Sequence, residues 1–403
     1  MYVCQSLAKL FNKSTAPTTI TIKNNERSEI MDFVCKKNDL EYALNYATRA
    51  AASKSTSSIL ECVLLTASAE NGISLIGTDS QISINTAPFS AEVDKEGSIA
   101  LNSKLFYDIV RKLPGDLIRI EADDKLRTIM TSGKSVLKMS GLSSYDFPLV
   151  VEEDLVAKEK FKINANTLKD MIRQTIFSVS TDPTKLVLTG ELMEIKEQIL
   201  RVVAIDMFRI SYRAEKVTEN NYECKAVVPA RALGELSRMV PSEKDEEMEF
   251  FFTDKKAVFI MDDFRMVANL LHGDFIRYDQ IFNSDFSTKV NINREMFLFS
   301  CERVMLLSSE GKPINMKISI GDEELLVYAI TEKGEVNDVI SCTTDGKELT
   351  IYFNPRYFSE VLRAIETENI TIKFNSVMSP CTISLDDDNP NFKYLIVPLR
   401  PPQ

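Results

Sequence analysis

A short stretch near the middle of the chain decides the fold: Phe161-Lys162-Ile163-Asn164-Ala165-Asn166-Thr167-Leu168. Its first four residues alternate between apolar and polar, as on a half-buried strand. From Leu168 the apolar positions continue at Met171 and Ile172 and reach Thr175, which places them on one face of a helix. The stretch therefore predicts a short strand that leads into an amphipathic helix.

The same design occurs three times along the chain. Its copies begin at Phe33, Phe161 and Val290, at steps of 128 and 129 residues. A second strand–helix unit occupies 99–106, 226–233 and 351–358. The steps of this second unit are 127 and 125 residues. Chance similarity could explain one recurring unit but not two that advance in phase, so we expect three homologous domains of ordinary size.

We place the three repeats at 31–155, 156–285 and 286–403, after an N-terminal tail or extension at 1–30. Each repeat holds two strand–helix units and further alternating strands. This order indicates an α+β fold in which two helices pack on antiparallel sheets in every domain. An asparagine is expected to cap the first helix of each repeat; the candidates are Asn38, Asn166 and Asn293.

The composition limits the class of protein. Acidic residues outnumber basic ones, 59 to 48, for a formal net charge of -11, which argues against a chain that coats nucleic acid with its whole surface. Seven cysteines without a C-x-x-C pair are typical of a reduced cytoplasm, not of a disulfide scaffold or a zinc site. The sequence has neither an apolar run long enough to span a membrane nor the pattern of a signal peptide. We therefore expect a cytoplasmic protein with no membrane partner.

The basic residues gather on the expected helices and at their ends, whereas acidic residues crowd into turns. The candidates for a shared basic surface are Arg49, Lys54, Lys104, Arg111, Lys169, Arg173, Arg231, Arg238, Arg294, Arg303, Arg356 and Arg363. One amphipathic helix with a charged outer face would be ordinary. Six such helices in three repeats favour a common surface, which could meet the phosphates of duplex DNA without reading its sequence.

Catalysis finds little support in the sequence. The single histidine, His272, precedes Gly273 in an expected loop, and a lone histidine is more often structural than catalytic. The chain lacks nucleotide-binding glycine loops and the H-E-x-x-H and G-x-S-x-G patterns. The acidic run at 386–388 resembles a solvated turn more than a magnesium site. We therefore expect no enzyme activity, no catalytic residue, no cofactor and no bound metal.

Four short markers, taken with the three repeats, identify a known family. They lie at 77–79, 144–148, 204–210 and 394–400. In this order they resemble the beta subunit of bacterial DNA polymerase III, the sliding clamp, over the whole chain from Met31. The resemblance implies a head-to-tail dimeric ring whose helices line the hole, and a processivity factor that encircles duplex DNA. The alternative is a multi-domain protein-interaction scaffold that does not encircle DNA.

The resemblance also implies a peptide pocket between the second and third repeats. The replicative polymerase catalytic subunit, the clamp loader, repair polymerases and clients of the mismatch-repair and ligase type would dock there. The matching positions are Leu188, Ile205, Met207, Phe208, Arg209, Ile210, Ile276, Gln280, Ile281, Val397, Pro398, Leu399 and Arg400. The family commonly has Gly-His where this chain has Met207-Phe208, proline in place of Ile276, and a basic residue in place of Gln280. We expect these differences to change which peptide motif the pocket prefers.

Overall fold

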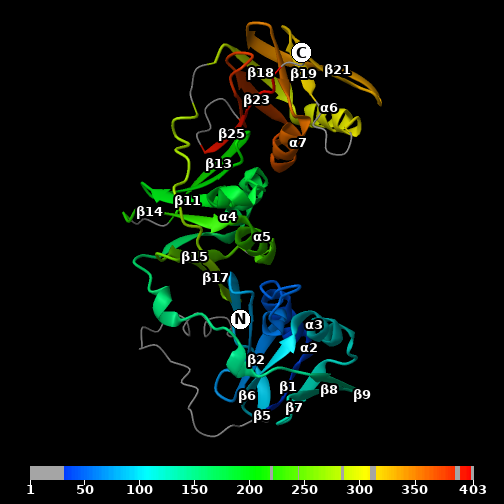
Figure 1. The fold of residues 1–403 in the computed structure, drawn as a ribbon, viewed down its shortest axis with the longest axis vertical. Helices are drawn as coiled ribbons and strands as arrows, with labels where there is room; N and C mark the ends of the chain where they lie inside the picture. The colour runs from blue at the N-terminus through cyan, green and yellow to red at the C-terminus, as the bar shows by residue number, and fades with distance from the viewer. Residues whose placement is uncertain are drawn as a thin grey trace. The chain divides into compact units, whose positions relative to one another are not determined.

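The computed structural model describes residues 31–217, 221–243, 245–282, 286–308, 315–385 and 391–400. The expected N-terminal tail and the acidic run at 386–388 lie outside the described residues. The chain falls into two compact units, and Figure 1 labels many of their helices and strands. The N-terminal unit runs up to Lys160 and includes Glu246–Asn269, and the C-terminal unit combines Phe161–Asp245 with the chain from Leu270 onward.

The N-terminal unit packs two helices with antiparallel strands. The helices are α2 (Lys37–Ala47) and α3 (Ser103–Lys112). One sheet has the order β5 (Ala91–Lys95), β1 (Met31–Lys36), β7 (Leu117–Ala122), β8 (Arg127–Ser132), β9 (Ser135–Ser140). A second run of strands has the order β15 (Glu247–Phe252), β16 (Lys256–Ile260), β17 (Phe264–Asn269), β4 (Ile82–Thr86), β3 (Gly72–Thr78), β2 (Cys62–Ser68), β6 (Gly97–Asn102). Phe33, Leu44, Leu65, Phe106 and Ile120 are fully buried in the core of this unit.

In its described residues, the C-terminal unit holds four α-helices and one long sheet. The helices are α4 (Ala165–Thr175), α5 (Ala230–Met239), α6 (Arg294–Leu306) and α7 (Pro355–Ala364), and β10 (Phe161–Asn164) leads into α4. The 12-stranded sheet has the order β14 (Cys224–Pro229), β11 (Gly190–Lys196), β12 (Ile199–Ile205), β13 (Arg209–Lys216), β25 (Phe392–Ile396), β24 (Cys381–Ser384), β23 (Asn369–Phe374), β18 (Thr288–Asn293), β21 (Gly334–Gly346), β20 (Glu324–Thr331), β19 (Met316–Ile320), β22 (Leu349–Phe353). Short 3-10 helices occur in both units. Those of the N-terminal unit are η1 (Ser58–Glu61), η2 (Ser144–Asp146) and η3 (Glu152–Leu155), and those of the C-terminal unit are η4 (Ile176–Ser178) and η5 (Pro183–Thr189).

Neighbouring repeats are joined by strand pairing. The fourth strand of the first repeat, β4, pairs antiparallel with the last strand of the second repeat, β17, so that Ile84 lies opposite Met266. This pairing draws β15–β17 into the N-terminal unit although they belong to the second repeat. The fourth strand of the second repeat, β13, pairs in the same way with β25 of the third, and Ile210 lies opposite Leu395. The same antiparallel pairing, here called the strand joint, therefore connects the first repeat to the second and the second to the third.

The expected fold class and helix positions are confirmed. The predicted apolar face of α4, formed by Leu168, Met171, Ile172 and Thr175, is buried against the sheet, with at most 1% of each residue exposed. Two helices pack on antiparallel strands in each repeat because the strand–helix units bury their apolar faces together. Within the described part of the chain, no helix is long and apolar enough to cross a membrane.

Two of the three expected helix caps are wrong. Asn38 and Asn166 lie inside the first turn of their helices, because α2 and α4 begin directly at the end of the preceding strand. In α4 the cap is Asn164, the last residue of β10, whose Oδ1 accepts the backbone N–H three residues on at 3.0 Å. Asn293 is confirmed as a cap, with the same bond at 3.0 Å. A strand without an intervening turn thus places the cap on its own last residue.

Candidate functional site

An exposed turn between β12 and β13 carries two of the predicted pocket residues. Met207 and Phe208 are 53% and 51% exposed, which is unusual for large apolar side chains in a tight turn. Met207 has a backbone φ of 82°, a conformation that residues other than glycine rarely adopt. The turn is held by Asp206, whose Oδ1 accepts the backbone N–H groups of Phe208 (3.0 Å) and Arg209 (3.1 Å). Backbone strain that presents apolar groups to solvent is typical of a binding site.

An apolar cluster on one face of β11–β13, here called the outer cluster, lies beside this turn. Its buried members are Leu188, Leu192, Val203, Ile205, Ile210, Val227, Tyr278 and Leu395. The partly buried residues packed against it are Val187, Tyr212, Leu271, Phe275, Phe282 and Val397. Ile276 and Ile281, each 37% exposed, come from the same segment as Phe275 and Tyr278. The cluster therefore provides an apolar floor, bordered by side chains that solvent still reaches.

Two tyrosines connect the outer cluster to polar groups. Tyr278 is buried, and its hydroxyl donates to the Glu194 carboxylate at 2.7 Å. Burial, followed by that carboxylate, raises the pKa of Tyr278 far above the ordinary tyrosine value, so the hydroxyl keeps its proton. Tyr212 packs its ring against Tyr278 with 5.9 Å between the ring centres. The segment that follows β17 is thus fastened to the sheet, and it can serve as a fixed wall.

Arg209 lies beneath the exposed turn and does not project into solvent. Its side chain is 6% exposed, and its Nε donates to Asp206 Oδ2 at 2.8 Å. The other nitrogens donate to the Glu360 carboxylate and to the backbone carbonyl of Phe177. The guanidinium also stacks over the ring of Tyr357, 4.7 Å from its centre. This predicted pocket residue therefore supports the turn from below.

The C-terminal residues line the other side of the turn. The backbone N–H of Val397 donates to the Phe208 carbonyl oxygen at 2.8 Å, and that of Leu399 donates to the Tyr352 carbonyl oxygen at 2.7 Å. Phe208 stacks on Tyr357, with ring centres 6.1 Å apart. Val397, Pro398 and Leu399 are partly exposed, and Arg400 is exposed. The segment after β25 is thus hydrogen-bonded both to the turn before β13 and to β22 of the third repeat.

The structure brings most of the predicted pocket residues together. Leu188, Ile205, Ile210 and Val397 lie in or against the outer cluster. Ile276, Gln280 and Ile281 are exposed on the segment that contributes Tyr278 to that cluster. The residues that sequence reasoning missed are Tyr357, Glu360, Phe275 and Tyr278. Tyr357 and Glu360 stand in the repeated unit that begins at 351, but their contacts with Arg209 join residues far apart in the chain and leave no local pattern.

The surface that carries the outer cluster in the second repeat has a different lining in the other two repeats. In each repeat, a leucine that follows the last strand forms an isolated antiparallel bridge with the strand before the second helix. The pairs are Leu142 with Ala100, Leu271 with Val227, and Leu399 with Tyr352. Phe147 then fills this surface in the first repeat, and it is buried against Cys62, Leu64 and Ala100. In the third repeat Lys317 lies opposite Tyr352, so that surface is not apolar. The second repeat combines an apolar floor with exposed apolar borders, which are the features of a peptide-binding groove.

The cations on the helices have two kinds of neighbour. The first helix of each repeat reaches the C-terminal carbonyls of the second: Lys37 donates to Leu113 (2.7 Å), Lys169 to Val240 (2.9 Å) and Arg294 to Leu362 (3.0 Å). Such contacts offset the negative end of a helix dipole. Of the predicted DNA-facing residues, Lys169 and Arg294 are therefore used within their own repeats.

Several other predicted DNA-facing cations form ion pairs. The pairs are Arg111–Glu41, Arg173–Glu366, Arg238–Glu235, Arg303–Asp338, Arg356–Glu360 and Arg363–Glu302. Arg49 donates to Asn45 at 3.3 Å, and Arg231 is exposed. Lys54 and Lys104 are exposed and enter no ion pair with a described residue. The helical surfaces thus carry cations whose charge is largely balanced nearby.

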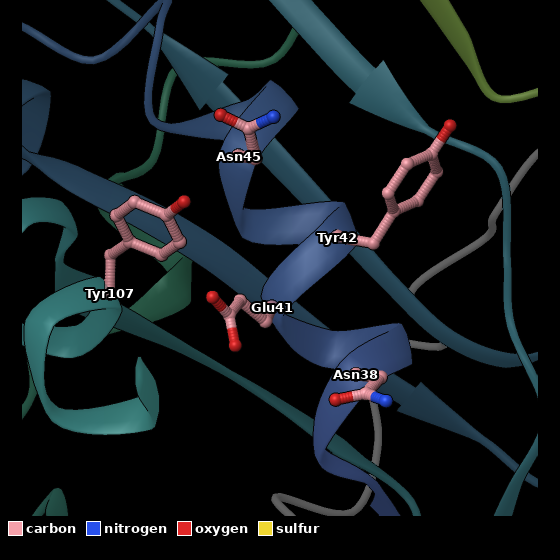
Figure 2. Close-up of a pocket in the computed structure, with 5 residues that line it drawn as sticks. All are labelled: Asn38, Glu41, Tyr42, Asn45 and Tyr107. Atoms are coloured by element: carbon pink, nitrogen blue, oxygen red, sulfur yellow. The ribbon is translucent and has the colours of Figure 1, made fainter. Parts of the chain in front are cut away.

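A polar hollow of about 350 Å³ lies between α2 and α3. Figure 2 shows Tyr107 of α3 facing Glu41 of α2 across it, with Asn38 and Asn45 at its two ends and Tyr42 pointing away. The carboxylate of Glu41 makes the hollow unfavourable for a phosphate group. No group of three or more histidine, cysteine or acidic residues suited to a metal occurs in the described part of the chain.

Comparison with known proteins identifies the family to which the chain is similar. The N-terminal, central and C-terminal domain models of the DNA polymerase III beta subunit match 31–151, 162–276 and 279–400. The beta sliding clamp of Halalkalibacterium halodurans is 35% identical over 386 residues, covering 92% of this chain and 100% of that protein. That of Staphylococcus epidermidis is 30% identical over 380 residues, with the same two shares.

Solved structures agree with this assignment. The Bacillus subtilis DNA polymerase sliding clamp is 28% identical and matches with a TM-score of 0.87, covering 92% of this chain and 99% of that chain. The Streptococcus pneumoniae DNA polymerase III beta chain is 29% identical, with a TM-score of 0.86 and shares of 92% and 100%. The chain belongs to the DNA polymerase III beta subunit family, the beta sliding clamps.

Proposed function

We propose that this chain is the processivity factor of a replicative DNA polymerase. Two copies close into a ring around duplex DNA, and the ring tethers the polymerase while catalysing no reaction itself. The observation that carries the proposal is the succession of three clamp domains over 31–400, in family order and without a gap longer than a linker. This succession favours a clamp over a scaffold that does not encircle DNA. Its place of work is the cytoplasm, with the chromosome.

The proposed contact with DNA is weak and independent of sequence. Lys54 and Lys104 offer exposed charges to phosphates, whereas cations such as Arg111 and Arg363 have acidic neighbours within 3.8 Å and 2.8 Å. Each phosphate contact releases counterions and strengthens binding, so a surface with few unbalanced cations binds loosely. Loose contact suits a ring, because enclosure keeps it on DNA and the ring must still move.

The repeated strand joint suggests how two copies close. Within the chain, β4 pairs with β17 and β13 pairs with β25. The corresponding strand of the third repeat is β21, and residues 335–341 of β21 pair with β20 on one side only among the described strands. The last strand of the first repeat, β9, pairs only with β8 among those strands. We propose that β21 of one copy pairs with β9 of the next, a head-to-tail contact that closes after two copies.

Exposed apolar side chains support this joint. Val136 on β9 is 60% exposed, Val339 on β21 is 56% exposed, and Leu306 at the end of α6 is 78% exposed. An exposed strand edge that carries apolar residues is a template for pairing with another chain. We propose the boundaries near 155 and 285 as the limits of the three clamp domains. The first falls between β9 and β10, and the second falls between β17 and β18.

The proposed partner site is the outer cluster with the turn at Met207 and Phe208. An extended peptide would place apolar side chains on the outer cluster, between Ile276 and the chain end at Val397. Its sources are the replicative polymerase catalytic subunit, the clamp loader, repair polymerases and clients of the mismatch-repair and ligase type. Because Met207 and Phe208 are larger and more apolar than glycine and histidine, they narrow the groove and favour a peptide with a compact apolar group at that end.

Retention on DNA tests the proposal. The protein is loaded by the cognate clamp loader onto a nicked circular plasmid, and the complex is separated by gel filtration. A ring stays on the closed circle and leaves after the plasmid is cut once. Equal retention on circular and linear DNA would reject encirclement, and absence of retention on both, with an active loader, would favour the scaffold.

A further inference from the structure

We infer that Glu360 is a positioning residue for the partner site: through the guanidinium of Arg209 it holds the turn Asp206–Arg209 in the shape that presents Met207 and Phe208. The inference rests on the proposed peptide site and names how that site keeps its form. It assigns Arg209 a place behind the peptide, although the sequence predicts it among the residues that line the pocket.

The first observation is that Arg209 has little left to offer a ligand. A guanidinium carries five N–H donors in a fixed fork. Separate nitrogens of Arg209 already serve the Asp206 carboxylate, the Glu360 carboxylate and the Phe177 carbonyl. Two aromatic rings also pack against it, since the ring centres of Phe177 and Tyr357 lie 5.5 Å and 4.7 Å from the guanidinium carbon. With 6% of its side chain exposed, Arg209 cannot meet a peptide directly.

The second observation is that Glu360 is itself fixed. It stands on α7, where Phe358, Val361 and Leu362 are buried in the core of the third repeat. One carboxylate oxygen accepts from Arg209, and the other accepts from Arg356 Nε at 2.8 Å. Its side chain is 22% exposed, so the ion pair with Arg209 is shielded from most solvent. Glu360 thus gives the turn a partner anchored in the next domain.

The third observation concerns what the turn would do without this partner. The backbone at Met207 is held at a φ of 82°, which is unfavourable for a side chain with a Cβ. Asp206 restrains the turn from one end, but it shares the same guanidinium. Without Glu360, Asp206 alone balances the buried cation, and we expect the guanidinium to shift towards water, since an incompletely paired buried charge is costly. Movement of Arg209 would carry the backbone of Phe208 with it and disturb the stack on Tyr357.

The test compares Glu360→Gln with Glu302→Gln, both in the full-length chain. Glu302 pairs with Arg363 at 2.8 Å on the helices of the same repeat and has no contact with the turn, so it is a matched control. The probe is a fluorescein-labelled peptide from the clamp-binding segment of the replicative polymerase, followed by anisotropy. We expect Glu360→Gln to weaken binding by about tenfold or more, because it removes one of the two carboxylates that balance a buried guanidinium. Glu302→Gln should stay within about twofold, as for an exposed pair, and Glu360→Asp, which restores the carboxylate, should recover part of the affinity.

A spectroscopic reporter separates positioning from a general loss of structure. The chain has no tryptophan, so Phe208→Trp introduces a single indole at the turn. With the peptide absent, acrylamide should quench this indole more efficiently when Glu360→Gln is added than when Glu302→Gln is added. Far-UV circular dichroism and molar mass should be the same for all variants.

The outcomes distinguish this inference from the proposed function. If the unaltered chain fails to bind the peptide, the partner site itself is wrong. If it binds, and Glu360→Gln binds equally well, positioning by Glu360 is refuted. Weaker binding with unchanged quenching would also refute it, because Glu360 would then act on the peptide without moving the turn.

Discussion

A buried carboxyl group should make the stability of the C-terminal unit depend on pH. Glu191 on β11 is fully buried, and neither of its carboxyl oxygens has a hydrogen-bond partner among the described residues. Burial raises the pKa of Glu191 to about 8. The neighbouring Thr175 hydroxyl lowers this pKa by a smaller amount. Its proton is donated to the Met171 carbonyl oxygen at 2.7 Å and so is not donated to Glu191. The folded protein therefore keeps Glu191 protonated at neutral pH.

The sign and size of the effect follow from the two pKa values. In the unfolded chain Glu191 ionises near 4.5, whereas in the folded chain it ionises near about 8. Below pH 4.5 the group is protonated in both states and costs nothing. Between these values the folded state binds the extra proton, so stability falls as pH rises, and the loss is complete above about 8. At about 1.4 kcal/mol per pH unit, the cost at neutral pH is about 3 kcal/mol.

The assay compares the unaltered chain with Glu191→Gln. The amide carries no proton that pH can remove, so its unfolding free energy lacks this dependence. Urea unfolding followed by far-UV circular dichroism should show the variant gaining about 3 kcal/mol on the unaltered chain between about pH 5 and about pH 7.5. Glu197→Gln, at an exposed position of the same hairpin, is the control and should change little. Parallel pH curves for Glu191→Gln and the unaltered chain would refute the reasoning.

Three further results are expected. Changing Lys54 and Arg231 together to Glu should slow loading onto nicked circular DNA while the molar mass stays that of a dimer, and unchanged loading would remove these residues from the DNA surface. Truncation after Ile396 should abolish binding of the polymerase peptide in an anisotropy titration, because Val397 and Leu399 are tied to the turn and to β22, and undiminished affinity would contradict the pocket assignment. Val136→Asp on β9 should reduce the mass seen by light scattering from about twice 45.5 kDa to one chain, whereas Val377→Asp, at an exposed position in a turn, should not; a dimer in both would exclude β9 from the joint.

The fold could be predicted because its signal is local and repeated. A strand that changes from period two to a helical period can be recognised within one segment, and the burial of Leu168, Met171 and Ile172 confirms it. The caps at Asn38 and Asn166 were predicted two residues late, because no turn separates strand from helix. Local patterns thus predict which elements form, and they place the ends of those elements less well.

The charged residues show where local patterns stop. Twelve cations on the expected helices and beyond their ends predict a basic surface. Yet Arg173 pairs with Glu366, 193 residues away, as well as with Asp170 in its own helix. The partner of Arg363 is Glu302, 61 residues away. Neither distance leaves a trace in the order of the sequence. Arg209 is the clearest case, because an arginine beside two exposed apolar residues suggests a group that meets ligands. Its burial is favourable because two carboxylates pair with it, one from Asp206 in the same turn and one from Glu360, 151 residues away.

The position of the proposed partner site follows from the same strand pairing that connects the repeats. The pairing of β13 with β25 places the turn at Met207 beside the chain end at Val397. No single repeat could supply the site, since its floor comes from the second repeat and the residues that hold the turn, Tyr357 and Glu360, come from the third. The equivalent joint between the first and second repeats offers no such site, because Phe147 already fills the apolar surface there. A repeated fold can therefore carry a single kind of proposed partner site when the apolar surface of one repeat stays open, that of another is filled by the chain itself, and that of the third is not apolar.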